Sequence, residues 1–157
     1  MSSRQAIAEI GLLLQLLDEG YERKTWHGPN LKQSLRGVSA KAAVWRPRRG
    51  RHNIWELAIH AAYWKYVVRR RLLGERKGSF VIEGSNWFGT PRTADEAAWR
   101  QAQQLLDDEH RKLRAVVADP RHSSGIKRRS QMVLGVAFHD IYHAGQIRLL
   151  RKLQNRA

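Results

Sequence analysis

The chain has 157 residues, of which 42% are hydrophobic, and it contains six tryptophans and no cysteine. This composition predicts one folded domain over residues 1–157, and it excludes disulfides, thiolate metal ligands and a cysteine nucleophile within the chain. The formal net charge of +15 predicts a basic surface that attracts anions, although a charged surface by itself often serves only solubility.

Membrane segments are not expected in this sequence. The first ten residues lack the uninterrupted apolar core of a signal peptide, and no stretch approaches the roughly 20 apolar residues that span a bilayer. We therefore expect a cytoplasmic protein without a membrane partner. The basic residues fall at helix ends and in loops and form no recognisable groove-reading helix, so a nucleic-acid partner is not expected either.

The first predicted helix covers about residues 3–17, with Ile7, Ile10, Leu14 and Leu17 facing inward and Gly20 just beyond its end. A connection of about 30 residues follows, which is too long to lack structure in a compact bundle. We expect short helical turns in it, near residues 30–36 and 39–44.

Three more long helices are predicted. The second begins after the cap residue Asn53 and extends to about residue 73, and the third begins at a capping box at Thr93 and extends to about residue 118. The fourth covers about residues 130–153. Four amphipathic helices with a long first crossover that contains short helices predict an all-α fold, a four-helix bundle.

The fourth helix carries two histidines one turn apart, where a helix of this kind should bury hydrocarbon. His139 and His143 lie on the same stripe as Val136 and Ile147. Side chains four residues apart stand one above the other, so both imidazoles can converge on one ion. A buried imidazole needs partners for its nitrogens, and a divalent cation would supply one.

His60 is the natural third ligand, because it lies well inside the second helix near its apolar face, between Leu57 and Trp64. Three imidazoles leave a divalent ion such as Zn, Ni or Fe with an open coordination position, as in catalytic sites. The spacing of two histidines alone is a weak signal, and buried structural histidines are the alternative interpretation.

Two longer strings carry a family resemblance: HDIYHAGQI at residues 139–147 and NIWELAIH at residues 53–60. With the upstream segments WHGP, LRGVS and WRP, they make nearly the whole chain resemble the DinB/YfiT-like family. The resemblance implies a four-helix bundle with a three-histidine metal site, which maps onto His60, His139 and His143. Characterised relatives are metal-dependent transferases or isomerases that use low-molecular-weight thiols such as mycothiol or bacillithiol. The family name does not imply DNA binding.

Other residues are candidates for supporting roles. Gln146 and Asp140 are candidates for orienting a metal ligand or contacting substrate, with Gln146 the better placed. Glu109 is a candidate general base, although a buried ion pair with an arginine is the more ordinary explanation of an inward-facing acid. Arg48 or Arg51 could bind a carboxylate of an acidic thiol cofactor.

Aromatic residues are candidates for the walls of a substrate site, with Trp64 regarded as core. The candidates are Tyr63, Trp64, Trp87, Phe88 and Tyr142. Four further histidines are not expected to bind the metal: His27 in a loop near the pocket mouth, His52 next to a helix cap, His110 in packing and His122 in a solvated loop.

The leading hypothesis is a divalent-metal enzyme in which a low-molecular-weight thiol or a water occupies the open position, giving a thiol-dependent transferase or a hydrolase acting on a small-molecule substrate. Two alternatives are a basic helical module that binds nucleic acid or another partner, and a bundle that the metal only stabilises. The extended apolar surface of the fourth helix and the family resemblance both favour a homodimer.

Overall fold

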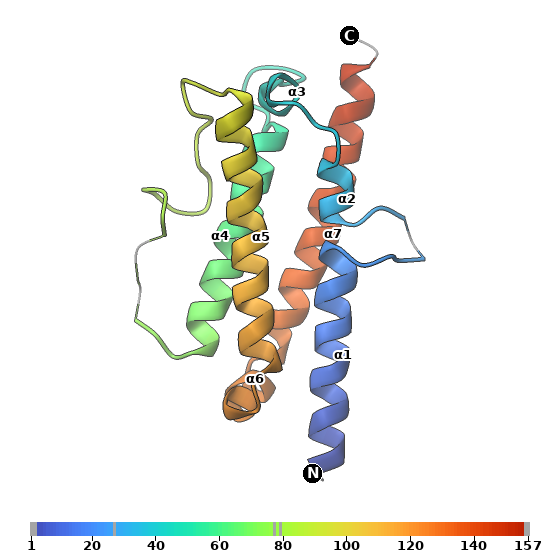
Figure 1. Ribbon diagram of the computed structural model, residues 1–157, viewed down its shortest axis with the longest axis vertical. Coiled ribbons are helices and arrows are strands. Elements are labelled where there is room, and N and C mark those ends of the chain that lie inside the picture. Colours follow the sequence, from blue (N-terminus) through green and yellow to red (C-terminus); the bar gives the residue numbers. More distant parts are fainter. Residues whose placement is uncertain (1–2, 27, 77, 79, 156–157) are drawn as a thin grey trace.

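Four long helices lie side by side along the long axis of the molecule (Figure 1). The computed structural model describes residues 3–26, 28–76, 78 and 80–155. The long helices are α1 (Ser3–Tyr21), α4 (Ile54–Leu72), α5 (Glu96–Ala118) and α7 (Ser130–Gln154). No strand occurs among the described residues, and the predicted all-α bundle is confirmed.

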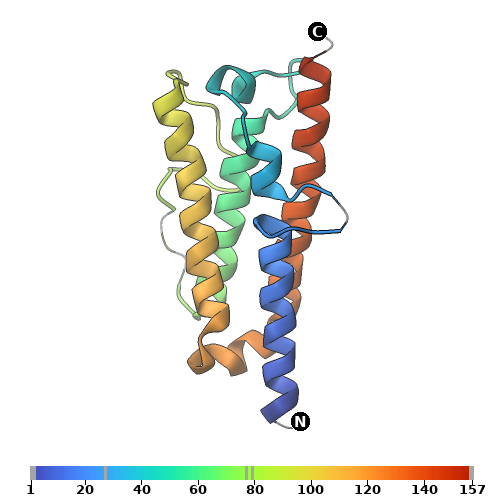
Figure 2. The same cartoon turned by 45° about the vertical axis from the view of Figure 1, so that its right-hand side comes forward.

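The connections between the long helices contain the short ones. Helix α2 (Leu31–Leu35) follows the end of α1 and packs on α7, and α3 (Ala40–Val44) leads to α4 (Figure 2). Both short helices were expected in the first connection. At the opposite end, a 3₁₀ turn (Pro120–His122) and α6 (Ser123–Arg128) join α5 to α7.

The connection between α4 and α5 is a second long crossover, which the sequence did not predict as such. The described residues between 73 and 95 return along the outside of the bundle, so that α4 and α5 run in the same direction, opposite to α1 and α7 (Figure 1). This crossover carries Asn86, Trp87 and Phe88, which places their backbone along the flank of α4.

Side-chain caps fix where the helices begin. Asn53 accepts a hydrogen bond from the backbone N–H of Glu56 at 2.9 Å, as predicted for the start of α4. The predicted cap at Thr93 is wrong, because Asp95 caps α5 by accepting from the N–H of Ala98. Glu96, which a capping box at Thr93 would have used, instead accepts from the N–H of Ala40 at 2.8 Å and ties α3 to α5.

The end of α1 also differs from the prediction. Gly20 lies inside the helix, which continues to Tyr21. A Cβ at position 20 would lie 2.9 Å from the carbonyl oxygen of Ala137, so this glycine permits close approach of α1 and α7. Of the residues predicted to face inward on α1, Leu17 is buried, Ile10 and Leu14 are half-buried and Ile7 is exposed, while Leu13 is buried as well.

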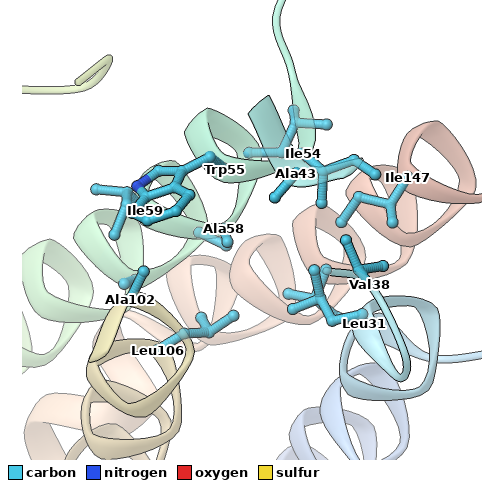
Figure 3. Close-up of a cluster of buried hydrophobic side chains, with 14 of the residues drawn as sticks. Leu31, Val38, Ala43, Ile54, Trp55, Ala58, Ile59, Ala102, Leu106 and Ile147 are labelled. Atoms are coloured by element: carbon cyan, nitrogen blue, oxygen red, sulfur yellow. The ribbon is translucent and has the colours of Figure 1, made fainter. Parts of the chain in front are cut away.

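Two apolar clusters form the core. The larger one unites α2, α3, the first half of α4, the first part of α5 and the C-terminal half of α7 around Ile54, Trp55, Leu106 and Ile147 (Figure 3). Trp99 lies in the same cluster and donates its indole N–H to the carbonyl of Val38 at 2.7 Å. The smaller cluster, nearer the other end, includes Leu113, Val117 and Val136. In α5 the predicted Leu113 is buried, as are Leu106 and Val117, whereas the predicted Leu105 and Val116 are half-buried.

Along each long helix, buried polar residues lie between the residues of the two apolar clusters. Lys65 on α4 and Asp140 on α7 are both completely buried and form an ion pair. The Lys65 ammonium also lies 4.8 Å from the centroid of the Tyr21 ring, which stacks on the imidazole of His110. His110 is thus a packing histidine, as expected.

Candidate metal centre

The three predicted metal ligands come together at the interface of α4 and α7. His60 lies in the second turn of α4, and His139 and His143 lie one turn apart on α7. The Nε2 atom of His139 is 3.1 Å from Nε2 of His60 and 2.9 Å from Nε2 of His143. His60 and His143 are buried, and His139 is partly buried. The rings therefore point their Nε2 atoms at one common centre.

The outer nitrogens show which tautomer two of these rings adopt. Nδ1 of His60 donates to the carbonyl oxygen of Asn86 at 2.7 Å, and Nδ1 of His143 donates to Oε1 of Gln146 at 2.6 Å. A carbonyl oxygen can only accept, so in the neutral ring the proton is on Nδ1 and Nε2 presents a lone pair. The side-chain N–H₂ of Gln146 donates in turn to Tyr142 Oη at 3.2 Å, which fixes the orientation of this amide.

This arrangement fits a divalent cation. Nε2 of His139 faces both of these lone pairs and carries at most one proton to share between them, whereas a divalent cation between the three rings would accept all three lone pairs. Nitrogens bound to one tetrahedral zinc at about 2.0–2.1 Å stand roughly 3.3 Å apart, so the observed separations need to open by only a few tenths of an ångström. The chain supplies three ligands, and a fourth position would remain for a reactant.

The environment keeps the three imidazoles neutral. Burial lowers the pKa of His143 to about 4. Burial, and then the neighbouring His143 and His60, lower the pKa of His139 to about 3. Burial also lowers the pKa of His60, although its hydrogen bond to Asn86 opposes that shift. Neutral imidazole is the form that binds a metal, so the rings are ready to act as ligands at neutral pH.

Aromatic rings stack on the outer side of the site. The Trp87 indole lies flat on His60, with 3.8 Å between centroids and an interplanar angle of 4°, and His52 stacks on the other side of this indole at 3.6 Å. The indole N–H of Trp64 donates to Oδ1 of Asn86 at 3.0 Å. The crossover segment 86–87 thus clamps His60 between a backbone carbonyl and an indole ring.

The predicted wall residues divide into two groups. Trp87, Trp64 and Tyr142 lie beside the histidines, with Tyr142 edge-on to His143 at 5.2 Å. Tyr63 and Phe88 lie in a separate aromatic cluster with Phe80. These two residues therefore support the crossover rather than wall the site.

The three candidate supporting residues also separate. Gln146 contacts His143 directly. Asp140 is one residue from His139, but its side chain is buried against Lys65. Glu109 is buried and forms ion pairs with Arg69 at 3.2 Å and Lys112 at 2.8 Å. The pair with Arg69 is the alternative to a general base that the sequence analysis proposed. Of the three, only Gln146 belongs to the histidine centre in this structure.

Asn86 and His52 are residues of the site that the sequence did not identify. Asn86 has a positive φ of 63°, a conformation that asparagine adopts more readily than most residues, but an asparagine in a loop is too common to predict its role. His52 was assigned a capping or surface role, and its Nδ1 does lie 2.9 Å from Oε2 of Glu56. His27 lies outside the described residues.

Cavities lie on both sides of the histidine centre. One, of about 390 Å³, lies toward the C-terminal end of α7, and Arg48, Arg51, Gln146 and Leu149 are among its lining residues. The other, of about 190 Å³, lies toward the N-terminal end of α7 and is lined by Trp64, Val68, Met132, Val136 and His139 itself, with Arg71 at its edge. Of the three histidines, His139 lines the smaller cavity, and the larger cavity is lined by Gln146, which contacts His143.

A second group of potential ligands is unsuited to a cation. Asp18, Glu22 and His110 offer ligand atoms within 4.8 Å of one another. However, Arg114 and Arg23 both pair with Asp18. Burial, followed by Lys65 and Arg114, lowers the pKa of His110 to about 2. The positive charge already present disfavours a further cation there.

Some of the basic residues form ion pairs within the fold and do not contribute a free positive charge to the surface. Lys65 is completely buried with Asp140, Arg69 pairs with Glu109, and Arg46 pairs with Glu56. The basic run at residues 65–71 is therefore not a continuous surface patch. Within the part of the chain that the structure describes, no helix is both long enough and apolar enough to cross a bilayer.

The comparisons with known proteins agree with the architecture and the site. The family model of the DinB superfamily matches residues 24–147, which include α4, α5 and all three histidines. The chain belongs to the DinB superfamily. No curated protein and no solved structure matches it.

Proposed function

We propose that this chain is a metal-dependent enzyme in which His60, His139 and His143 hold a divalent ion and the reaction transfers a group to a low-molecular-weight thiol. The observation that carries the proposal is the convergence of three Nε2 atoms whose outer nitrogens are held by Asn86 and Gln146. In a purely structural cluster a proton on Nε2 of His139 would be the single donor between two facing lone pairs, whereas a metal ion would accept all three.

The chemistry that the ion would supply is acidification of a bound thiol or water near neutral pH. The chain's own residues prepare for it. Asn86 and Gln146 keep the protons on the Nδ1 atoms and hold the rings in position. Trp87 covers one face of His60 and excludes water from it. Because the chain has no cysteine, the thiol must come from a diffusible cofactor.

The two cavities favour group transfer over hydrolysis. A transferase must hold two organic reactants at the same centre, whereas a hydrolase needs one organic substrate and a water. Here the larger cavity is lined by Gln146, which contacts His143, and the smaller one is lined by His139. Hydrolysis is the second candidate, since the same open position accepts water.

A direct test loads the protein, purified without a histidine tag, with Zn²⁺, Ni²⁺ or Fe²⁺ and supplies bacillithiol, mycothiol or glutathione with an electrophile such as 1-chloro-2,4-dinitrobenzene. The proposal predicts metal-dependent thioether formation that His143→Ala abolishes. His122→Ala, in the 3₁₀ turn between α5 and α6, should leave this activity intact. Ester hydrolysis without thiol transfer would favour the hydrolase. Bound metal without either activity would leave only a stabilising ion and refute the proposal.

We also propose that the chain forms a homodimer through α1 and the N-terminal half of α7. Phe138 is 59% exposed on α7, and Ile7 and Leu12 are 69% and 55% exposed on α1, the helix that packs beside it. Burying such side chains against a second copy removes apolar surface from water. Sedimentation velocity should show a dimer that Phe138→Glu dissociates and that Lys152→Glu, on the same helix, does not; a monomeric parent protein would contradict this.

A further inference from the structure

The larger cavity beside the histidine centre has a composition that selects its ligand. It lies between the turn at residues 47–52 and the C-terminal half of α7, and it has about 390 Å³, within the usual range for small-molecule sites. The residues that matter here are Arg48, Arg51, Leu57, Gln146, Leu149 and Leu153. We refer to this cavity as the arginine pocket.

Two arginines of the pocket are brought together by a tight turn. The N–H of Arg51 donates to the carbonyl of Arg48 at 3.3 Å, and Gly50 occupies the turn with a φ of 79°. Arg46 fixes this turn from beneath, because its guanidinium donates to the carbonyl oxygen of Arg51 at 2.6 Å and also pairs with Glu56. The turn is therefore anchored from within the fold.

The side chains of Arg48 and Arg51 remain available. Within residues 3–155, leaving aside positions 27, 77 and 79, neither guanidinium has a hydrogen-bond or ion-pair partner, while Glu56, the nearby acid, is occupied by Arg46 and His52. Both residues are exposed, and each contributes a positive charge to the lining of one cavity, which attracts an anion. A guanidinium also binds a carboxylate or phosphate through two parallel hydrogen bonds.

Apart from His52 and Gln146, the rest of the lining is apolar. Leu57 is buried in the wall, and Leu149 and Leu153 are 58% and 40% exposed, so hydrocarbon is left in contact with water in the pocket. The amide of Gln146 is already engaged by His143 and Tyr142, and Nδ1 of His52 lies 2.9 Å from Oε2 of Glu56. A ligand that fits must therefore carry an anionic end for the arginines and an apolar body for the leucines.

We propose that the arginine pocket binds an organic anion with an apolar body, a carboxylate or a phosphate monoester, and that this anion is one of the two reactants of the metal centre. The assignment as a reactant rests on the proposed function, whereas the affinity for anions does not. Gln146 lies both in the pocket and against His143, so a ligand held there reaches the vicinity of the ion.

The test uses hexanoate, hexyl phosphate, acetate and hexanol as probes, titrated into the metal-free full chain by calorimetry. Hexanoate or hexyl phosphate should bind at least tenfold more tightly than acetate or hexanol, because only these probes offer both the charge and the chain. The double variant Arg48→Gln/Arg51→Gln should weaken that binding at least tenfold. Arg49→Gln is the matched control, since it removes the same charge from the same turn but does not line the pocket, and it should change affinity less than twofold.

Several results would overturn the proposal. Equal weakening by Arg49→Gln would mean that net charge alone attracts the probes, and equal binding of hexanol would mean that the pocket is only apolar. A sedimentation shift from dimer to monomer on adding hexanol would assign the leucines to a second copy of the chain. Hexanoate that binds only after zinc is added, and is insensitive to the arginines, would be a metal ligand. Failure of the chain to bind metal, with hexanoate binding intact, would refute the proposed function and leave the anion site standing.

Discussion

The buried pair of Lys65 and Asp140 gives a sharp test of the fold beside the site. Replacing Asp140 by alanine leaves an ammonium group with no exposed surface, whose remaining neighbours are Nδ1 of His110 at 3.5 Å and the Tyr21 ring. Removing one partner of a buried ion pair costs about 3–5 kcal/mol. Because the Tyr21 ring still contributes about 0.5–2 kcal/mol of cation–π attraction, we expect a loss near the lower end of that range.

The loss in the free energy of unfolding can be measured as a shift of the melting temperature. At about 2.1 cal/mol/K of unfolding entropy per residue, a chain of 157 residues loses roughly 3 °C for each kcal/mol, so a loss of about 3 kcal/mol in Asp140→Ala should lower the melting temperature by about 9 °C. Calorimetry of the metal-free protein at pH 7.5 measures the shift without a contribution from bound metal. At this pH the carboxylate is ionised, since burial raises its pKa only to about 6.

The double variant Lys65→Met/Asp140→Ala is the decisive control. It removes both charges together and should recover at least half of the stability that Asp140→Ala loses. The reasoning is refuted if Asp140→Ala lowers the free energy of unfolding by less than about 1 kcal/mol, or if the double variant is no more stable than the single one.

Three further changes test separate parts of the account. Gly20→Ala should destabilise the protein by about 1–3 kcal/mol in urea unfolding, because the new Cβ meets a backbone carbonyl of α7, whereas Gly11→Ala, with open space around it, should stabilise by about 1 kcal/mol; equal effects would contradict the close packing. Gln146→Ala should weaken zinc affinity about 10- to 100-fold in competition with a chelating dye, and an unchanged affinity would show that its amide does not orient a ligand. Burial lowers the pKa of His110 to about 2 in the folded protein, against about 6.5 in the unfolded chain, so the unfolded chain binds more protons and the free energy of unfolding falls as the pH drops below 6.5. His110→Phe should reduce this pH dependence by about 1.4 kcal/mol per pH unit. An identical pH dependence in the variant would refute the burial of His110 as a neutral ring.

The periodic parts of the sequence predicted the fold well. Four long amphipathic segments, the cap at Asn53 and the two short helices near residues 30–36 and 39–44 are all present. The errors concern features that periodicity does not encode. Gly20 was expected to end α1, but it lies within the helix because another helix approaches it there.

The candidate site was predictable where its residues lie on helices. His139 and His143 share a face by spacing alone, and His60 was singled out by its apolar neighbours, so their convergence was within reach of the sequence. The loop residues were not. Asn86 acts through its backbone carbonyl, which any residue possesses, and His52 reaches the site only through the stacked Trp87 ring. The sequence could not show that Asp140 pairs with Lys65 instead of contacting the histidines, because Lys65 lies on another helix.

The metal content of the protein, purified without a histidine tag and dialysed against one equivalent of Zn²⁺, tests the central claim most directly. We expect elemental analysis to find one ion per chain in the parent protein and in His52→Ala, and less than about one tenth of an ion in the His60→Ala, His139→Ala and His143→Ala variants. Zinc retained at full stoichiometry by all three variants, or absent from the folded parent protein, would contradict a metal centre at these histidines.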